Sequence, residues 1–420
     1  MIRKETFDNG LTLLTERMPD VRSVSIGVWL RQGSRSEPPE INGISHFIEH
    51  LVFKGTKRRT ARQIALTMDA LGGHMDAFTS KEYTCFYAKV LDEHVPAALE
   101  LLADIVQRPR FDPAELERER KVILEEIRMV EDTPDELLYD LFVSHFYPSH
   151  PLGRPIQGTE RSVAGMSRRQ LLGFFRHAYR PANMLISAAG HVDHAATAAR
   201  VRRVFRQLRP GPPPDGPNGS PRASWGVVRR DKRELEQVHL LLGVPAYPER
   251  FEHRYSLYVL NTILGGTMSS RLFHKIRERR GLAYSVYSAV NAFLDAGFLT
   301  IYAATSPKNA EEVVRLVVHE LADLRDHGPT AQELRVAKEH LKGSLMLSLE
   351  STSARMSNLA RQEIYFGKRI SAAETLRRLQ AVGVRDVRTL AGQMLREARL
   401  GLAAVGRVRR LRLRQEALRL

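Results

Sequence analysis

Apolar residues recur along this chain with two different periods, which separate short strands from long helices. Alternating apolar and polar positions are typical of half-buried strands, whereas apolar positions three and four residues apart indicate amphipathic helices. The strand-like segments are 24–31, 83–90, 237–243 and 298–304. The helical segments are 41–54, 61–71, 94–107, 113–131, 252–264, 308–327 and 330–349. This mixture predicts an α+β architecture in which helices pack on sheets.

A proline- and glycine-rich run over 210–221 divides the chain into nearly equal halves. Such a run holds neither a helix nor a central strand, so it indicates an exposed linker. The two halves are weakly self-similar. The end of the first half, 171–192, resembles the end of the second, 390–408. A long helical stretch follows segment 112–116 in the first half, and another follows the similar segment 329–334 in the second. The repeat is too long for a solenoid and predicts a duplicated domain. The predicted boundaries are a first domain over 1–209, a linker over 210–225, a second domain over 226–410 and a basic tail over 411–420.

The helix over 41–54 carries the motif His46-Phe-Ile-Glu49-His50 on the side opposite its apolar stripe. Two neutral imidazoles four residues apart can hold one Zn²⁺, and the carboxylate beside them can take a proton from water. The order H-x-x-E-H is the inverse of the commoner H-E-x-x-H zinc signature and is called the inverzincin pattern. The alternative is a solvated helix face that carries two histidines and a glutamate.

Two histidines leave a zinc site incomplete, so the metal hypothesis requires a third protein ligand. The helix over 113–131 offers Glu119 and Glu126, two helical turns apart on one side. That side is predicted to face inward because it also carries apolar residues: Val122, Ile123 and Val130. A carboxylate there needs a cation or a hydrogen bond, which suits Glu126 as a metal ligand and Glu119 as an acceptor that orients a ligand. The alternative for Glu119 is ordinary surface charge, the role expected of Glu125.

With these motifs in place, the sequence resembles the M16 metallopeptidase family, which includes pitrilysin, insulin-degrading enzyme and the mitochondrial processing peptidase. The family follows its H-x-x-E-H motif with a glutamate at the separation seen here, where Glu126 lies 76 residues after His50. Segment 71–87 resembles the family's cleft-lining strand, 117–126 its ligand helix and 277–284 its Arg…Tyr element. The resemblance covers about residues 2 to 408 and is closest to the short bacterial members.

The resemblance implies the LuxS/MPP-like metallohydrolase fold, in which two homologous domains face each other like a clamshell. It also implies a zinc-dependent metalloendopeptidase that hydrolyses unfolded peptides or oligopeptides enclosed between the domains. One Zn²⁺ per chain would be held by His46, His50 and Glu126, with Glu49 as the base. The second half has no H-x-x-E-H, so it is expected to be inactive and to hold substrate.

Two further elements receive roles through the same resemblance. Tyr284 and Arg277, from the second domain, would donate hydrogen bonds to the substrate carbonyl and its developing oxyanion. The alternatives are a structural tyrosine and a surface arginine. Substrate would add as a strand along Asp76, Ala77, Phe78 and Thr79, with main-chain pairing that accepts any sequence. For Phe78 the alternative is core packing.

Two features bear on substrate preference. The non-catalytic subunit of the mitochondrial enzyme has a long glycine-rich loop, whereas the matching region here is only Gly265–Ser270. This departure favours a general peptidase over one that removes targeting presequences. The segment 131–140 concentrates acidic residues in an otherwise basic chain, and we hypothesise that it attracts peptides with basic residues.

Composition bounds the cellular setting. The chain has 420 residues, of which 43% are apolar, enough to bury more than one core. It has no run of about eighteen apolar residues, so no membrane span is expected. Its amino terminus carries charges where a signal peptide needs an apolar core. Cys85 is the only cysteine, which fits a reducing compartment, and we expect it to be a small buried strand residue. These features predict a cytoplasmic location.

The net charge of +16 raises the question of nucleic acid or an anionic membrane as a partner. No recognisable nucleic-acid fold or aromatic stacking platform accompanies the charge, so neither partner is expected. Much of the excess is dispersed arginine, and the cluster over 407–414 alternates arginine with leucine or valine. That alternation indicates a solvated terminal helix or a frayed tail.

One chain supplies only two such domains, so closing a full chamber is expected to need a homodimer or a heterodimer with a related subunit. The competing hypothesis is a non-catalytic subunit or scaffold of an M16-type heterodimer. The intact ligand set together with Glu49 argues against it.

Overall fold

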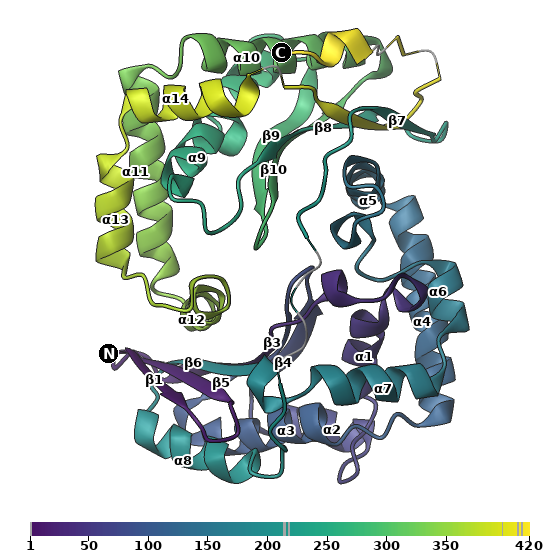
Figure 1. The fold of residues 1–420 in the computed structure, drawn as a ribbon, viewed down its shortest axis with the longest axis vertical. Helices are drawn as coiled ribbons and strands as arrows, with labels where there is room; N and C mark the ends of the chain where they lie inside the picture. Colours follow the sequence, from purple (N-terminus) through teal and green to yellow (C-terminus); the bar gives the residue numbers. More distant parts are fainter. Residues whose placement is uncertain (1, 213–215, 217–218, 397, 410, 413–414) are drawn as a thin grey trace. The chain divides into compact units, whose positions relative to one another are not determined.

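Two β-sheets organise the chain, and each belongs to its own unit (Figure 1). The computed structural model describes residues 2–212, 216, 219–396, 398–409, 411–412 and 415–420. Unit 1 comprises Met1–Arg128, Arg154–Asn218 and Leu347–Arg369, and unit 2 comprises Met129–Gly153, Gly219–Met346 and Ile370–Leu420. The predicted α+β class is confirmed. Parts of the predicted linker (213–215, 217–218) and tail (413–414) lie outside the described residues.

Unit 1 is built on a six-stranded sheet in the order β1-β2-β6-β3-β5-β4. Its strands are β1 (Ile2–Thr6), β2 (Thr12–Arg17), β3 (Ser23–Leu30), β4 (His74–Thr79), β5 (Thr84–Leu91) and β6 (Met184–Gly190). Neighbours run antiparallel, except for the parallel pair β2 and β6. β4 pairs with β5 alone, so one side of its backbone faces no other strand of the described chain.

Helices cover both faces of this sheet. One face carries α1 (Ile44–Val52), α2 (Ala61–Ala70), α3 (Val95–Gln107), α4 (Pro113–Asp132), α6 (Glu160–Gly165), α7 (Arg168–Ala178) and α8 (His194–Val204). α12 (Thr352–Phe366) packs on the opposite face (Figure 1). Val24, Ile26 and Val28 of β3 point into the first layer, and Trp29 points towards α12. Because both of its faces are covered, β3 is apolar along almost its whole length.

Unit 2 repeats this plan with a five-stranded sheet in the order β7-β11-β8-β10-β9. Its strands are β7 (Gly226–Asp231), β8 (Val238–Ala246), β9 (Ala283–Ala292), β10 (Gly297–Thr305) and β11 (Gly401–Gly406). Again one pair, β7 and β11, is parallel. The main core on one face is shared with α9 (Arg254–Asn261), α10 (Ala310–Asp326), α11 (Ala331–Ser348), α13 (Ala372–Ala381) and α14 (Val384–Leu395). On the other face lies α5 (Pro134–Phe146), whose Phe142 and Phe146 contact Phe298 (Figure 1).

Each half of the sequence contributes one helix to the unit that is built mainly from the other half. α5 precedes the linker in sequence but packs on β8 and β11 of unit 2, and α12 follows the linker but packs on β3 and β6 of unit 1. For each helix, a glycine in the underlying strand leaves the space that the helix side chains occupy. A Cβ at Gly27 would lie 2.7 Å from Met356 Sδ, and one at Gly243 would lie 2.3 Å from Phe142 Cζ.

The predicted domains 1–209 and 226–410 follow the duplication in the sequence, and their boundaries stay a prediction. The compact units divide the chain at more points, after residues 128, 153, 218, 346 and 369. The additional crossings arise because α5 and α12 each leave their own half.

Most predicted elements are found within a few residues of their expected bounds. Two helices differ. The segment 41–54 becomes a 3₁₀ turn over Pro39–Ile41 and then α1, because Gly43 at φ 94° cannot continue a helix. The segment 252–264 changes from α9 into a π-helical turn over Thr262–Gly266. The inward-facing assignment of Val122 is wrong, since its side chain is 43% exposed.

Two leucines near the chain end are buried, which differs from the predicted solvated terminal helix or frayed tail. Leu411 and Leu418 are buried in the main core of unit 2, and the backbone N–H of Leu400 donates to the carbonyl of Leu418 at 3.0 Å. These two leucines are therefore core residues. Cys85 is buried in β5, as predicted. Nowhere in the described chain is a helix both long enough and apolar enough to cross a bilayer.

Candidate metal centre

The helix α1 separates apolar and polar side chains as its sequence predicts. Its apolar residues are 0–1% exposed: Ile44, Phe47, Ile48, Leu51 and Val52. His46, Glu49 and His50 are only partly buried on the other side. Packing of the apolar stripe therefore holds the three polar side chains in one direction.

A buried carboxylate fixes the start of α1. Glu37 accepts hydrogen bonds from the backbone N–H of Gly43 at 2.7 Å and of Ser45 at 2.9 Å, and from Asn42 Nδ2 at 2.9 Å. These bonds satisfy donors that a first helical turn leaves unpaired, at the end where negative charge is favoured. Burial raises the pKa of Glu37, against the lowering effect of these bonds. Sequence reasoning missed this residue because Glu37 precedes α1 across a loop and matches no local capping pattern.

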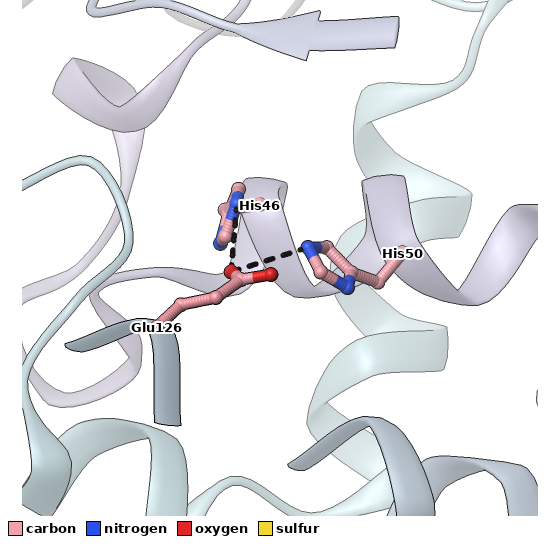
Figure 2. Close-up of side chains that lie close together, drawn as sticks. All are labelled: His46, His50 and Glu126. Atoms are coloured by element: carbon pink, nitrogen blue, oxygen red, sulfur yellow. Dashed lines mark ion pairs between the residues drawn. The ribbon is translucent and has the colours of Figure 1, made fainter. Parts of the chain in front are cut away.

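The ligand atoms of His46, His50 and Glu126 lie within 4.8 Å of one another (Figure 2). Glu126 Oε2 is 3.8 Å from His46 Nε2 and 3.5 Å from His50 Nε2. Zinc bonds of about 2.0–2.1 Å in a tetrahedron place ligand atoms about 3.4 Å apart. Two imidazoles and one carboxylate are also a donor set that catalytic zinc uses. The predicted residues therefore fit a zinc ion both in chemistry and in spacing.

Burial favours the form of histidine that binds metals. It lowers the pKa of His46 to about 4, with a smaller lowering from the nearby His50. The imidazole of His46 is therefore neutral near pH 7 and has a lone pair for a cation.

Glu119 contacts the second ring nitrogen of His50. Its Oε2 lies 3.1 Å from His50 Nδ1, and its Oε1 lies 2.9 Å from the ammonium of Lys54. The Glu119 side chain is only 6% exposed, so it is not ordinary surface charge. By contrast, Glu125 is exposed and pairs with Arg128 at 2.5 Å, as predicted.

Glu49 lies on the same side of α1 as the histidines. The hydroxyl of Thr79 donates to Glu49 Oε2 at 2.5 Å, which links α1 to β4. Burial raises the pKa of Glu49 to about 7, against the lowering effects of that hydrogen bond and of His50. A carboxyl group in this range can both accept and release a proton near neutral pH.

The predicted substrate strand is the edge strand β4. Its side chains alternate, with Asp76 and Phe78 exposed and Ala77 and Thr79 partly buried. The Phe78 ring lies edge-on to Trp29 at a centroid distance of 5.8 Å but is still 37% exposed, so it is not a fully buried core residue.

Arg277 and Tyr284 lie together in unit 2. The guanidinium carbon of Arg277 lies 5.0 Å from the centre of the Tyr284 ring and 4.8 Å from that of Phe273. The Tyr284 side chain is 75% exposed, so its hydroxyl is not committed to the core. Their role in catalysis stays a proposal.

Comparison with known proteins gives a consistent assignment. The model of Insulinase (Peptidase family M16) matches residues 12–160, and that of the Peptidase M16 inactive domain matches residues 165–341. The chain is 44% identical over 412 residues to an uncharacterized zinc protease of Mycobacterium bovis, covering 96% of this chain and 93% of that protein. It is also 44% identical over 397 residues to one of Bacillus subtilis, covering 94% and 96%.

A solved structure extends the likeness to the whole fold. The crystal structure of a protease from Helicobacter pylori superposes with a TM-score of 0.90 at 22% identity, covering 96% of this chain and 99% of that one. The predicted resemblance and its fold of two homologous domains are thereby confirmed. The chain belongs to peptidase family M16 and is similar to its short bacterial members.

Proposed function

We propose that this chain is a zinc-dependent metalloendopeptidase that hydrolyses peptide bonds in unfolded peptides or oligopeptides. The observation that carries the proposal is the convergence of two imidazoles and a distant carboxylate beside Glu49. Relatives named as zinc proteases support it.

His46, His50 and Glu126 would hold one zinc ion per chain. When bound, zinc polarises a peptide carbonyl and lowers the pKa of a coordinated water towards about 7. Glu119 would accept a hydrogen bond from His50 Nδ1–H, which orients the ring and leaves the Nε2 lone pair directed at the site.

Glu49 would move the proton. Its carboxylate accepts a proton from the attacking water and delivers it to the amide nitrogen that leaves as an amine. The hydrogen bond from Thr79 holds one carboxylate oxygen, so the other is available for this transfer.

Substrate would bind by adding a strand to β4. The edge of β4 that no other described strand pairs with, along Asp76, Ala77, Phe78 and Thr79, offers main-chain donors and acceptors that read no sequence. Thr79 belongs both to this edge and to the hydrogen bond with Glu49, so strand addition would bring a peptide bond near the base. Arg277 and Tyr284 are proposed to donate hydrogen bonds to the substrate carbonyl. The acidic segment 131–140 is proposed to attract peptides with basic residues.

The proposed setting is cytoplasmic, with a homodimer or a heterodimer with a related subunit completing the chamber. The competing role, a non-catalytic subunit or scaffold, would leave Glu49 without a task. We therefore infer that this chain is the catalytic partner of any such assembly.

The test compares wild type with Glu49→Gln by zinc content and by cleavage of a quenched fluorescent peptide library. Both proteins should hold one zinc per chain, and only the wild type should turn over. Glu125→Gln is the matched control, because it removes an exposed carboxylate that contacts Arg128 rather than the site. Equal turnover by wild type and Glu49→Gln would sink the proposal.

A further inference from the structure

A cavity of about 280 Å³ in unit 1 is surrounded by arginines. It lies where the loop after α1 meets the ends of α3 and α8. The arginines are Arg58, Arg59, Arg108, Arg203 and Arg206. No residue of the metal centre lines this cavity, so its occupant is a separate question from peptide hydrolysis.

Two of these arginines are held in place by a buried carboxylate. Asp104, only 1% exposed, accepts hydrogen bonds from Arg59 Nη1 at 2.7 Å and from Thr56 Oγ1 at 2.7 Å. It also lies 3.5 Å from Arg108 Nη1. Arg108 Nη2 in turn donates to Gln207 Oε1 at 2.9 Å. These contacts orient two guanidinium groups before any ligand arrives.

The remaining charges are less balanced. Glu100 pairs with Arg203 at 2.9 Å, whereas the exposed side chains of Arg58 and Arg206 make no ion pair within the described chain. Five guanidinium groups against the carboxylates of Glu100 and Asp104 leave a net charge of +3 around the cavity. Like charges gathered in this way repel one another and attract anions, and a bound anion would relieve the repulsion.

The residues that line the cavity indicate which class of anion it would bind. Guanidinium groups offer paired N–H donors that match the oxygens of phosphate groups. The cavity is slightly smaller than the roughly 300–1,000 Å³ typical of drug-sized ligands, and none of the described residues that line it is an aromatic on which a base could stack. We propose that this pocket binds a short oligophosphate chain, either free or as the tail of a nucleotide, with the base taking no part.

Isothermal titration calorimetry of the full, zinc-loaded chain with sodium tripolyphosphate tests the proposal. We expect one saturable site per chain, weakened by added salt because the contacts are ionic. ATP should bind with a similar affinity and adenosine should not bind, which separates the phosphate chain from the base. The proposal would be overturned if tripolyphosphate or ATP showed no saturable binding. It would also be overturned if adenosine bound.

The decisive variant is Arg58→Ala/Arg206→Ala, which removes the two exposed, unbalanced arginines. Tripolyphosphate should bind it at least tenfold more weakly. Arg169→Ala/Arg176→Ala removes the same charge from exposed positions on α7 and should bind like wild type. If tripolyphosphate chelates the zinc, the heat of chelation would be the same for wild type and both variants. The zinc content of each protein after the titration shows how much zinc was removed.

Three results would contradict the pocket as the site. One is unchanged binding by Arg58→Ala/Arg206→Ala, and another is an equal loss in the α7 control. The third is a thymidine oligonucleotide that binds more tightly than tripolyphosphate, which would assign the arginines to a nucleic-acid surface. Thermal unfolding midpoints equal to wild type will show that both double variants are folded.

Discussion

The two units share one plan but differ in the side chains that could perform chemistry. In both, one pair of neighbouring strands is parallel, a layer of helices covers one face, and a helix from the other half of the sequence covers the other face. α1 follows β3 in unit 1 as α9 follows β8 in unit 2. Yet α9 contains no histidine, aspartate or glutamate.

The ligand helix shows the same contrast. If the matching segments at the starts of α4 and α11 are aligned at Leu116 and Leu334, Glu119 corresponds to Ala337 and Glu126 to Ser344. Ala337 is 2% exposed and packs in the unit 2 core, at the position where unit 1 buries a carboxylate. The layered fold therefore does not depend on the metal ligands, and the proposed chemistry rests on a few polar residues added to it.

The largest expected effect comes from separating the two halves of the chain. Residues 1–218 alone lack α12, so the face of the sheet that contains Trp29 and Leu185 would be exposed to water. We expect this fragment to lack fixed tertiary structure by near-ultraviolet circular dichroism. Co-expression with residues 219–420 should restore it. A fragment 1–218 that folds and binds zinc like the full chain would show that the exchanged helix is dispensable.

A smaller effect should follow from Phe142→Ala, which weakens the exchanged helix of unit 2. Phe142 is fully buried, and such truncations cost about 3–5 kcal/mol of unfolding free energy. Urea unfolding measures that loss. Zinc content in the folded state should remain one per chain, because the proposed ligands all lie in unit 1. Loss of zinc from the folded variant would contradict the division of labour between the units.

The smallest expected effect is that of Glu119→Gln, which keeps the shape of the side chain but removes its charge. Loss of the negative acceptor beside His50 Nδ1 should weaken zinc binding by about 10–100-fold. Competition with a chromogenic chelator measures this change, and Glu117→Gln, an exposed position on the same helix, serves as the control. An affinity equal to wild type would mean that Glu119 does not support the ligand.

The clustering of His46, His50 and Glu126 could be predicted because its geometry is largely local. Helical periodicity places His46 and His50 on one side of their helix and Glu119 and Glu126 on one side of theirs. The site then forms once these two helices pack side by side. The exchange of α5 and α12 could not be predicted, because it depends on contacts between segments far apart in sequence. Glu37 was missed for another reason, because it lies across a loop from α1 and matches no local capping pattern. The arginine pocket was missed because three separate segments assemble it.

The position of α12 in the sequence has a consequence for synthesis. A growing chain emerges from the ribosome amino terminus first, and domains that are contiguous in sequence can fold as they appear. Here the sheet that supports α1 is covered on its second face by residues 352–366, so those residues must be made before unit 1 is complete. The proposed zinc site would therefore lie in an incomplete unit until α12 has been synthesised, which delays any activity of that site.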